Sequence, residues 1–205
     1  MGSDCRIIRL WDAKKEMRIM DLFTEDSSGA VTSLHYAPTT SASSLADLLI
    51  AGFTGGSVKI FDAREWGRAP ILKLDDLQGS PILDAKIQDC GGQNILLAGN
   101  AGGNIKMYDV RMPIQAVNIG SREMSLGHNV SSIAIHPRFG VMASWAQQQQ
   151  LVSIHTLDQD KGTCHLLNCV KYHEEGVLGV KLGIVKNNNL WSQTLKYKIS
   201  SILIF

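Results

Sequence analysis

The sequence predicts an all-β protein built from a repeated antiparallel sheet, and two observations carry this prediction. The stretch Ile50–Arg64 (IAGFTGGSVKIFDAR) returns 47 positions later as Leu97–Arg111 (LAGNAGGNIKMYDVR). Each copy is an apolar run, a pair of glycines and a second run that ends in an aromatic residue and Asp. That order is typical of a strand, a tight turn and a second strand. A fixed period of this length is typical of repeat architectures, so the search for function begins with a repeat.

An aromatic residue followed by Asp ends the second strand of each copy, and a third example precedes these two. The pairs are Trp11-Asp12, Phe61-Asp62 and Tyr108-Asp109. In Arg6–Asp12 (RIIRLWD), Ile8 and Leu10 alternate with Arg9 and Trp11, which predicts a strand whose wide aromatic residue covers a neighbouring sheet. Each Asp is expected to accept hydrogen bonds from backbone N–H groups in the turn that follows.

Two further strands follow each copy, so that four strands make one period. The expected outer strands are Lys14–Asp21, Pro70–Leu74, Ile114–Ile119 and Cys164–Val170, and the expected inner strands are Ala30–Tyr36, Ile82–Ile87, Val130–Ile135 and Gly176–Leu182. A fourth copy has diverged in sequence from the other three. Val141–Trp145 and Leu151–Ile154 stand for its two strands, Gln147–Gln150 replaces the glycines, and Thr156 lies 47 residues after Asp109.

Four strands in about 47 residues, with an aromatic-Asp strand end, predict a blade of a WD-repeat β-propeller. Propellers have about four to eight blades, so we expect residues 1–185 to form about four blades of a larger, incomplete ring. The remaining propeller blades are then missing from this chain. Residues 186–205 match no repeat position and are expected to form an atypical tail. An incomplete ring exposes an apolar face and a sheet edge, so we expect the chain alone to be marginally stable or prone to association.

The repeat positions predict structural roles. Gly55-Gly56 and Gly102-Gly103 are expected to form hairpin turns. Many WD repeats link a turn Asp, a Gly-His, a strand Ser and the Trp by buried hydrogen bonds, but Gly55 and Gly102 stand where that Asp would be. Gly127-His128 is the one good Gly-His pair. The blades are therefore expected to depend on packing of the aromatic column.

Composition excludes several partner classes. Twenty basic and nineteen acidic residues give a formal net charge of +1, which does not favour nucleic acid or an anionic membrane. No apolar run approaches the roughly 20 residues of a membrane-spanning helix, so membrane insertion is not expected. The four cysteines show no paired spacing, which favours a reducing, cytosolic compartment.

One cluster of soft ligands raises the question of a metal. It comprises His155, Cys164, His165, Cys169 and His173. Its spacing contains no CxxC or HxxxH, and adjacent residues on a strand point to opposite faces, so we expect buried cysteines and surface histidines rather than zinc ligands. No GxSxG, P-loop or HExxH is present. We therefore expect no cofactor and no enzymatic activity.

Basic residues recur in two columns. One comprises Arg9, Lys59 and Lys106 beside the aromatic residue, and the other comprises Lys14, Arg64 and Arg111 after the Asp. We expect these side chains to solvate the blade surface and to pair with nearby carboxylates. The alternative is a charged ring that docks an acidic segment of a partner.

Several sequence segments together resemble those of one protein family. They are Arg6–Met17 (RIIRLWDAKKEM), Ala30–Leu34 (AVTSL), Lys106–Pro113 (KMYDVRMP) and Ser132–Pro137 (SIAIHP), with the glycine-turn copies. They resemble the C-terminal WD-repeat propeller of the Raptor family, the scaffold subunits of TOR kinase complex 1. The resemblance covers Gly2–Pro137 well and Val141–Leu182 weakly.

The resemblance implies a non-catalytic scaffold in nutrient-responsive regulation of cell growth, with the TOR kinase complex as protein partner. It implies a place in the cytoplasm, with recruitment to lysosomal membranes as part of the complex. No partner-binding residue carries across, because substrate capture in the family is associated with regions that this sequence lacks. Two alternatives stay open: a WD-repeat adaptor in ubiquitin ligation, chromatin or trafficking, and an enzyme with polar ligands in the central channel.

Overall fold

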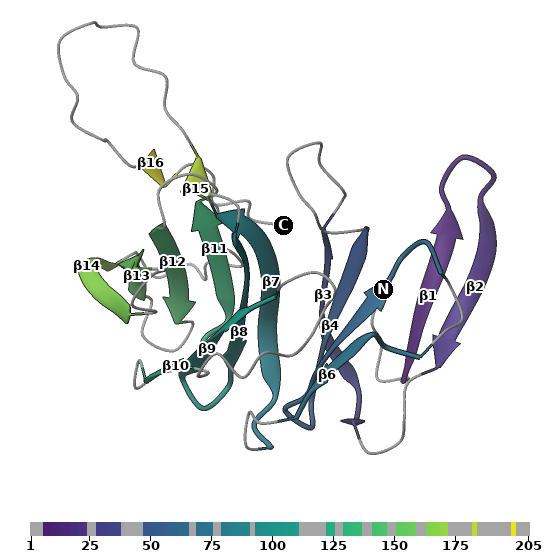
Figure 1. Ribbon diagram of the computed structural model, residues 1–205, viewed down its shortest axis with the longest axis horizontal. Coiled ribbons are helices and arrows are strands. Elements are labelled where there is room, and N and C mark those ends of the chain that lie inside the picture. Colours follow the sequence, from purple (N-terminus) through teal and green to yellow (C-terminus); the bar gives the residue numbers. More distant parts are fainter. Residues whose placement is uncertain are drawn as a thin grey trace, which may run out of the picture.

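The computed structural model is an array of antiparallel β-sheets (Figure 1). It describes residues 6–23, 28–37, 47–65, 69–75, 79–90, 93–110, 122–125, 129–136, 141–146, 151–158, 163–171, 182–183 and 198–199. All the elements found there are strands, so the prediction of an all-β protein is confirmed. Within these ranges, no helix is long and apolar enough to cross a membrane.

Sixteen strands follow one another along the described parts of the chain. They are β1 (Ile7–Asp12), β2 (Met17–Phe23), β3 (Val31–Ala37), β4 (Leu48–Phe53), β5 (Val58–Asp62), β6 (Leu72–Leu74), β7 (Ile82–Cys90), β8 (Gln93–Asn100), β9 (Asn104–Asp109), β10 (Arg122–Ser125), β11 (Ser132–His136), β12 (Val141–Ala146), β13 (Leu151–Asp158), β14 (Thr163–Lys171), β15 (Leu182–Gly183) and β16 (Lys198–Ile199).

The sheets are meanders in which each strand pairs with the next strand in the chain. Three have four strands, ordered β3-β4-β5-β6, β10-β9-β8-β7 and β11-β12-β13-β14, and two have two strands, β1-β2 and β15-β16. All the pairs are antiparallel. The repeat period therefore corresponds to one four-stranded sheet.

Two outer strands differ from the prediction. β2 is Met17–Phe23 instead of Lys14–Asp21, because residues 13–16 form the turn after β1. The strand that pairs with β9 is β10, Arg122–Ser125, instead of Ile114–Ile119. Residues 111–121 lie outside the described residues. An outer strand has one edge free and needs little burial, so the polar sequence REMS can pair there. The inner strand expected at Gly176–Leu182 lies outside the described residues except for Leu182, which belongs to β15, Leu182–Gly183.

The sheet β1–β2 and the three four-stranded sheets succeed one another in chain order, from β1–β2 at the right of Figure 1 to β11–β14 at the left. Three buried apolar clusters lie between neighbouring sheets. Ile8 and Leu22 pack with Phe53 and Phe61, a second cluster joins β4 and β5 to β7 and β8, and a third joins β8 and β9 to β11 and β12. A central sheet is therefore covered on both faces.

Glycine in the repeated Ala-Gly pair brings neighbouring sheets close together. A methyl group on Gly52 would lie 2.6 Å from Ile82 Cγ2 in the next sheet. The same group on Gly99 would lie 2.6 Å from Val130 Cγ1 and 3.0 Å from Ile133 Cδ1. Distances below about 3 Å are repulsive, so these strand positions admit no larger residue without a shift of the sheets.

The glycine pairs lie in the tight turns between β4 and β5 and between β8 and β9. In each pair it is the second glycine, Gly56 at φ +85° and Gly103 at φ +88°, that adopts a left-handed conformation. This region is unfavourable for residues with a Cβ atom. Gly55 and Gly102 precede these positions and have no positive φ.

Candidate interaction surface

The aromatic column shows how the sheets pack. Phe61 is 6% exposed and lies against the β1–β2 sheet, while Tyr108 is partly buried against the cluster that includes the core of β4 and β5. Each of these side chains therefore covers the preceding sheet. Trp11 occupies the same position in the first copy but is 57% exposed. The expectation that Trp11 covers a neighbouring sheet is wrong, because no described sheet lies on that side of β1.

The basic column corrects a second expectation. Lys59 is 1% exposed and Lys106 is 7% exposed, so neither solvates the surface as predicted. The Lys59 ammonium lies 5.3 Å from the centre of the Phe53 ring, an attractive cation–π geometry. Both lysines are therefore buried within the stack of sheets. Arg9, at the same position in the first copy, remains exposed.

The strand-end Asp residues stabilise the turns that follow. Asp12 Oδ1 accepts hydrogen bonds from the N–H groups of Lys14 at 2.9 Å and Lys15 at 3.1 Å. Asp62 Oδ1 accepts one from the Arg64 N–H at 2.8 Å, and its carboxylate also pairs with the Arg64 guanidinium at 2.7 Å. The side chain of Asp109 lies outside the described residues.

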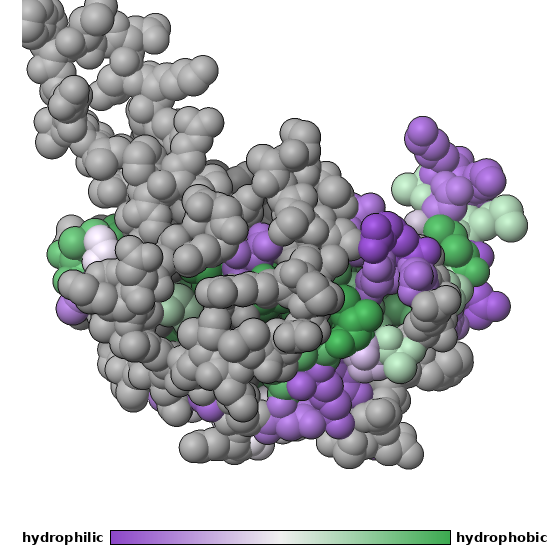
Figure 2. Space-filling view, viewed as in Figure 1, coloured by the Kyte–Doolittle hydropathy of each residue, from purple (hydrophilic) through white to green (hydrophobic). Residues whose placement is uncertain are grey.

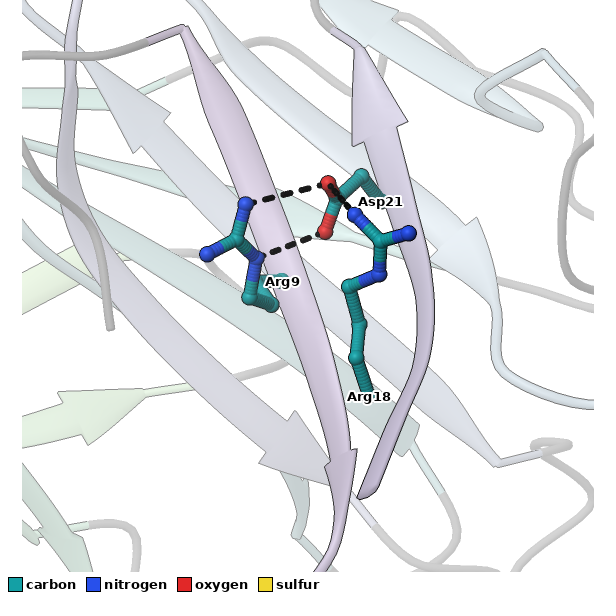
Figure 3. Close-up of polar contacts among 3 residues, drawn as sticks. All are labelled: Arg9, Arg18 and Asp21. Atoms are coloured by element: carbon teal, nitrogen blue, oxygen red, sulfur yellow. Dashed lines mark hydrogen bonds and ion pairs between the residues drawn. The ribbon is translucent and has the colours of Figure 1, made fainter.

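The outer face of the β1–β2 hairpin carries a charged group in which Arg9 is exposed and paired with a carboxylate, as the sequence predicted. Arg9 binds the Asp21 carboxylate through two nitrogens, at 2.8 and 3.1 Å, and Arg18 binds it at 3.1 Å (Figure 3). Arg9 reaches Asp21 from β1, whereas Arg18 lies on β2, the strand that carries Asp21. The hydrogen bond from Arg9 is the main cause that lowers the pKa of the Asp21 carboxyl. Two positive charges against one leave this group net positive. We call Arg9, Trp11, Arg18 and Asp21 the hairpin face.

Apolar side chains adjoin the hairpin face. Met17 is 62% exposed and Ile19 is 57% exposed, and the projecting hairpin mixes hydrophilic and hydrophobic residues at the right of Figure 2. Ile19 lies where the β1–β2 register shifts, between Leu10 and Trp11 on the facing strand. Exposed tryptophan and arginine are enriched at the centres of protein interfaces. The hairpin is therefore the candidate interaction surface.

A second polar group joins two inner strands. Asp84 and Lys86 lie on β7, with 2.9 Å between the carboxylate and the ammonium. The Ile133 N–H of β11 donates to Asp84 Oδ2 at 2.7 Å, and Lys86 donates to the Ile133 carbonyl oxygen. Both backbone groups of one residue are thus bound by the neighbouring sheet. The signal for this pair was an Asp and a Lys two positions apart, which share one face of a strand.

His35 on β3 lies beside this pair. Burial lowers the pKa of His35, and the positive charge of Lys86 acts in the same direction. A hydrogen bond with the Ile87 backbone opposes the change. The folded chain therefore favours neutral His35.

The histidine and cysteine cluster is distributed differently from the prediction. His155 is 5% exposed, and its Nε2 atom has no hydrogen-bond partner in the part of the chain that the structure describes. Burial lowers the pKa of His155. His165 and Cys169 are exposed, so the expectation of buried cysteines and surface histidines is wrong for His155 and Cys169. His155 lies 47 residues after Tyr108 and is buried because it occupies the aromatic column.

No group of three or more His, Cys, Asp or Glu side chains that could hold a metal occurs among the described residues. Cys169 lies on the outer strand β14, where its Sγ atom is 3.6 Å from Ser153 Oγ. Four sequence-predicted residues, His128, Arg111, His173 and the side chain of Cys164, lie outside the described parts.

Comparisons with known proteins show what the chain resembles. No family model matches it. Its sequence is 26% identical over 190 residues to the target of rapamycin complex 1 subunit mip1 of Schizosaccharomyces pombe, covering 87% of this chain and 14% of that protein. Its fold resembles the crystal structure of Chaetomium thermophilum Raptor, with a TM-score of 0.66, 23% identity and coverage of 88% of this chain. The chain spans 15% of that solved chain.

Proposed function

We propose that the chain is part of a WD-repeat β-propeller and serves as a non-catalytic protein-interaction scaffold in TOR complex 1. The sequence similarity to a subunit of target of rapamycin complex 1 is the observation that carries this proposal. The likeness to a Raptor crystal structure supports the same fold. Four-stranded meanders that stack in chain order, one for each repeat period, are what propeller blades require.

The chemistry of the repeat positions supports a scaffold. The strand-end Asp carboxylates of the first two copies accept hydrogen bonds from the turns that follow them. The buried members of the aromatic and basic columns pack between sheets. The exposed Trp11 and the arginines beside it supply contacts typical of protein recognition. In this proposal the chain acts in nutrient-responsive growth signalling, in the cytoplasm and on lysosomal membranes, through protein partners of the TOR kinase complex.

Affinity copurification tests the assignment. The tagged chain is expressed in cells, and TOR kinase is measured in the recovered material, with the core strand variant Gly99→Ala as a folding control. Recovery of TOR kinase with the wild-type chain, and a smaller amount with the destabilised control, is the expected result. Absence of TOR kinase from the recovered material, under conditions that recover the known subunits of the complex, would contradict the assignment.

A further inference from the structure

The inner strands of the three four-stranded sheets are joined by polar side chains as well as by the apolar core. Strands β3, β7 and β11 each lie at one end of their sheet, and among the described strands they pair only with β4, β8 and β12. Each of them therefore keeps one edge whose backbone groups are not used within its own sheet. Strand β3 packs against β7, and β7 packs against β11.

The contact between β7 and β11 uses both a carboxylate and an ammonium group. Asp84 Oδ2 accepts the Ile133 N–H at 2.7 Å and also lies 2.9 Å from the Lys86 ammonium. Lys86 donates in turn to the Ile133 carbonyl oxygen. The two side chains thus replace the acceptor and the donor that a neighbouring strand would supply at this edge. We call Asp84 and Lys86 the clamp.

His35 occupies in β3 the place that Lys86 occupies in β7. Lys86 comes two residues after Asp84, which lies opposite Gly99 of β8. His35 comes two residues after Ser33, which lies opposite the equivalent glycine of β4. The Ser33 hydroxyl does not act as the Asp84 carboxylate does, because its oxygen is buried without a hydrogen-bond partner in the part of the chain that the structure describes.

His35 is therefore the polar link between β3 and β7. Its imidazole forms a hydrogen bond with the Ile87 backbone of β7, and it lies close enough to the clamp for the charges of Lys86 and Asp84 to act on it. Strand β4, which pairs with β3, has no charged residue within Leu48–Phe53. Among the described side chains, the charges that face His35 are those of the clamp.

A proton on His35 changes the balance of charge at the clamp. An imidazolium places a second positive charge beside Lys86, which it repels, and it attracts the Asp84 carboxylate that binds Ile133. Burial first, and then the charge of Lys86, hold the pKa of His35 below its ordinary value of 6.5. Protonation of His35 and closure of the clamp therefore oppose each other.

We propose that His35 is a proton-sensitive switch on the contact between the inner strands β7 and β11, which is closed while the imidazole is neutral and loosens when it is protonated. Because the folded structure disfavours the proton, the contact is complete above the ordinary histidine pKa of about 6.5 and weakens as the pH falls below it. The inference depends on the geometry of the inner strands and goes beyond the proposed membership of TOR complex 1.

Amide hydrogen exchange of the whole chain, resolved by residue with NMR, tests the proposal. The reporter is the Ile133 amide, whose acceptor is Asp84. Relative to its intrinsic rate, its exchange should rise several-fold between about pH 7.5 and pH 5.5, and by at most about tenfold for each unit below 6.5. At about pH 5.5 this amide should be less protected than that of Ala98 in the central strand β8, because the clamp opens locally.

Two variants identify the group that takes up the proton. The His35→Asn side chain carries an amide that donates hydrogen bonds but does not titrate, so the relative exchange of Ile133 should no longer depend on pH. His155→Phe removes the buried histidine that lies in the same sheet as Ile133, and it should leave the pH response of Ile133 in place.

A second readout needs no substitution. In the wild-type chain, the NMR titration of the His35 imidazole should have the same midpoint as the change in the Ile133 amide chemical shift. The proposal is overturned by a pH response of Ile133 that persists in His35→Asn or disappears in His155→Phe, by different midpoints for the two signals, or by equal protection of Ile133 and Ala98 at low pH.

Discussion

The substitution Gly99→Ala probes the contact that sets the spacing between two sheets. An added methyl group would lie 2.6 Å from Val130 Cγ1, 2.9 Å from Val130 Cβ and 3.0 Å from Ile133 Cδ1. Val130 and Ile133 are buried in the same cluster, so neither can move aside freely. Overpacking of this kind costs about 1–3 kcal/mol. We expect Gly99→Ala to lower the free energy of unfolding by that amount.

A second substitution separates overpacking from other effects of alanine. Val130→Ala removes two methyl groups and should by itself cost about 1.5 kcal/mol of transfer free energy. In the double variant the added methyl group occupies the space that the valine vacates. The two costs should therefore fail to add, with a coupling of about 1 kcal/mol or more. Gly102→Ala is the matched control, because its nearest neighbour would lie 3.3 Å away and its φ is not positive.

Urea unfolding followed by circular dichroism measures these differences. We expect the wild type and Gly102→Ala to have the same free energy of unfolding and the double variant to have a lower one. The loss in the double variant should be smaller than the sum of the losses in its two single variants. Equal stability of Gly99→Ala and Gly102→Ala would refute the close-contact argument. Strictly additive single changes would show that the methyl group does not meet Val130.

Two further predictions concern buried polar groups. The pKa of His155 is lowered in the folded state, so stability should be complete above the ordinary histidine pKa of about 6.5 and fall below it by at most about 1.4 kcal/mol per pH unit. His155→Phe should flatten urea midpoints between about pH 7.5 and pH 5.5, leaving the part due to His35, and an unchanged slope would contradict this assignment. Asp84→Ala removes the acceptor of the Ile133 N–H and should cost about 1–3 kcal/mol, whereas Asp75→Ala, in an exposed pair with Lys73, should cost about 0–1 kcal/mol. Equal losses in these two variants would show that the contact between β7 and β11 is not stabilising.

Local sequence predicted the strands well because it records both turn chemistry and alternation. The glycine pairs and the aromatic-Asp strand ends fixed the limits of β5 and β9, where backbone geometry demands particular residues. The outer strands were harder to predict from the sequence. β10 has a polar sequence, and its position depends on pairing with β9, which no local pattern in Arg122–Ser125 reveals.

Burial of the basic column could not be read from the residues alone. Alternation placed Lys59 on the face opposite Ile60, and a charged side chain normally marks the solvated face. In a stack of sheets both faces of a central strand are covered, so the same alternation describes two buried surfaces. The apolar residues around Lys59 were the signal that could have predicted its burial. Val58, Ile60 and Phe61 are all buried, so this part of the strand has no solvated face.

The exposed Trp11 shows a different limit. Its local sequence resembles that of Phe61, but among the described residues a sheet covers Phe61 and none covers Trp11. Coverage of a repeat is a property of its neighbours, so no window within Arg6–Asp12 could predict it. Recognition of the repeat supplies this information once the structure shows which neighbours are present.

The stacked arrangement also determines how stability is distributed along the chain. In repeat proteins, stability is approximately the sum of the unit stabilities and the contacts between neighbouring units. Among the described residues, the sheets β3–β6 and β7–β10 pack against a neighbouring sheet on both faces, whereas the two-stranded sheet β1–β2 packs against one neighbouring sheet. Two-stranded sheets are marginal on their own in water. The β1–β2 hairpin is therefore the unit of the described stack that gains the least stability from its neighbours.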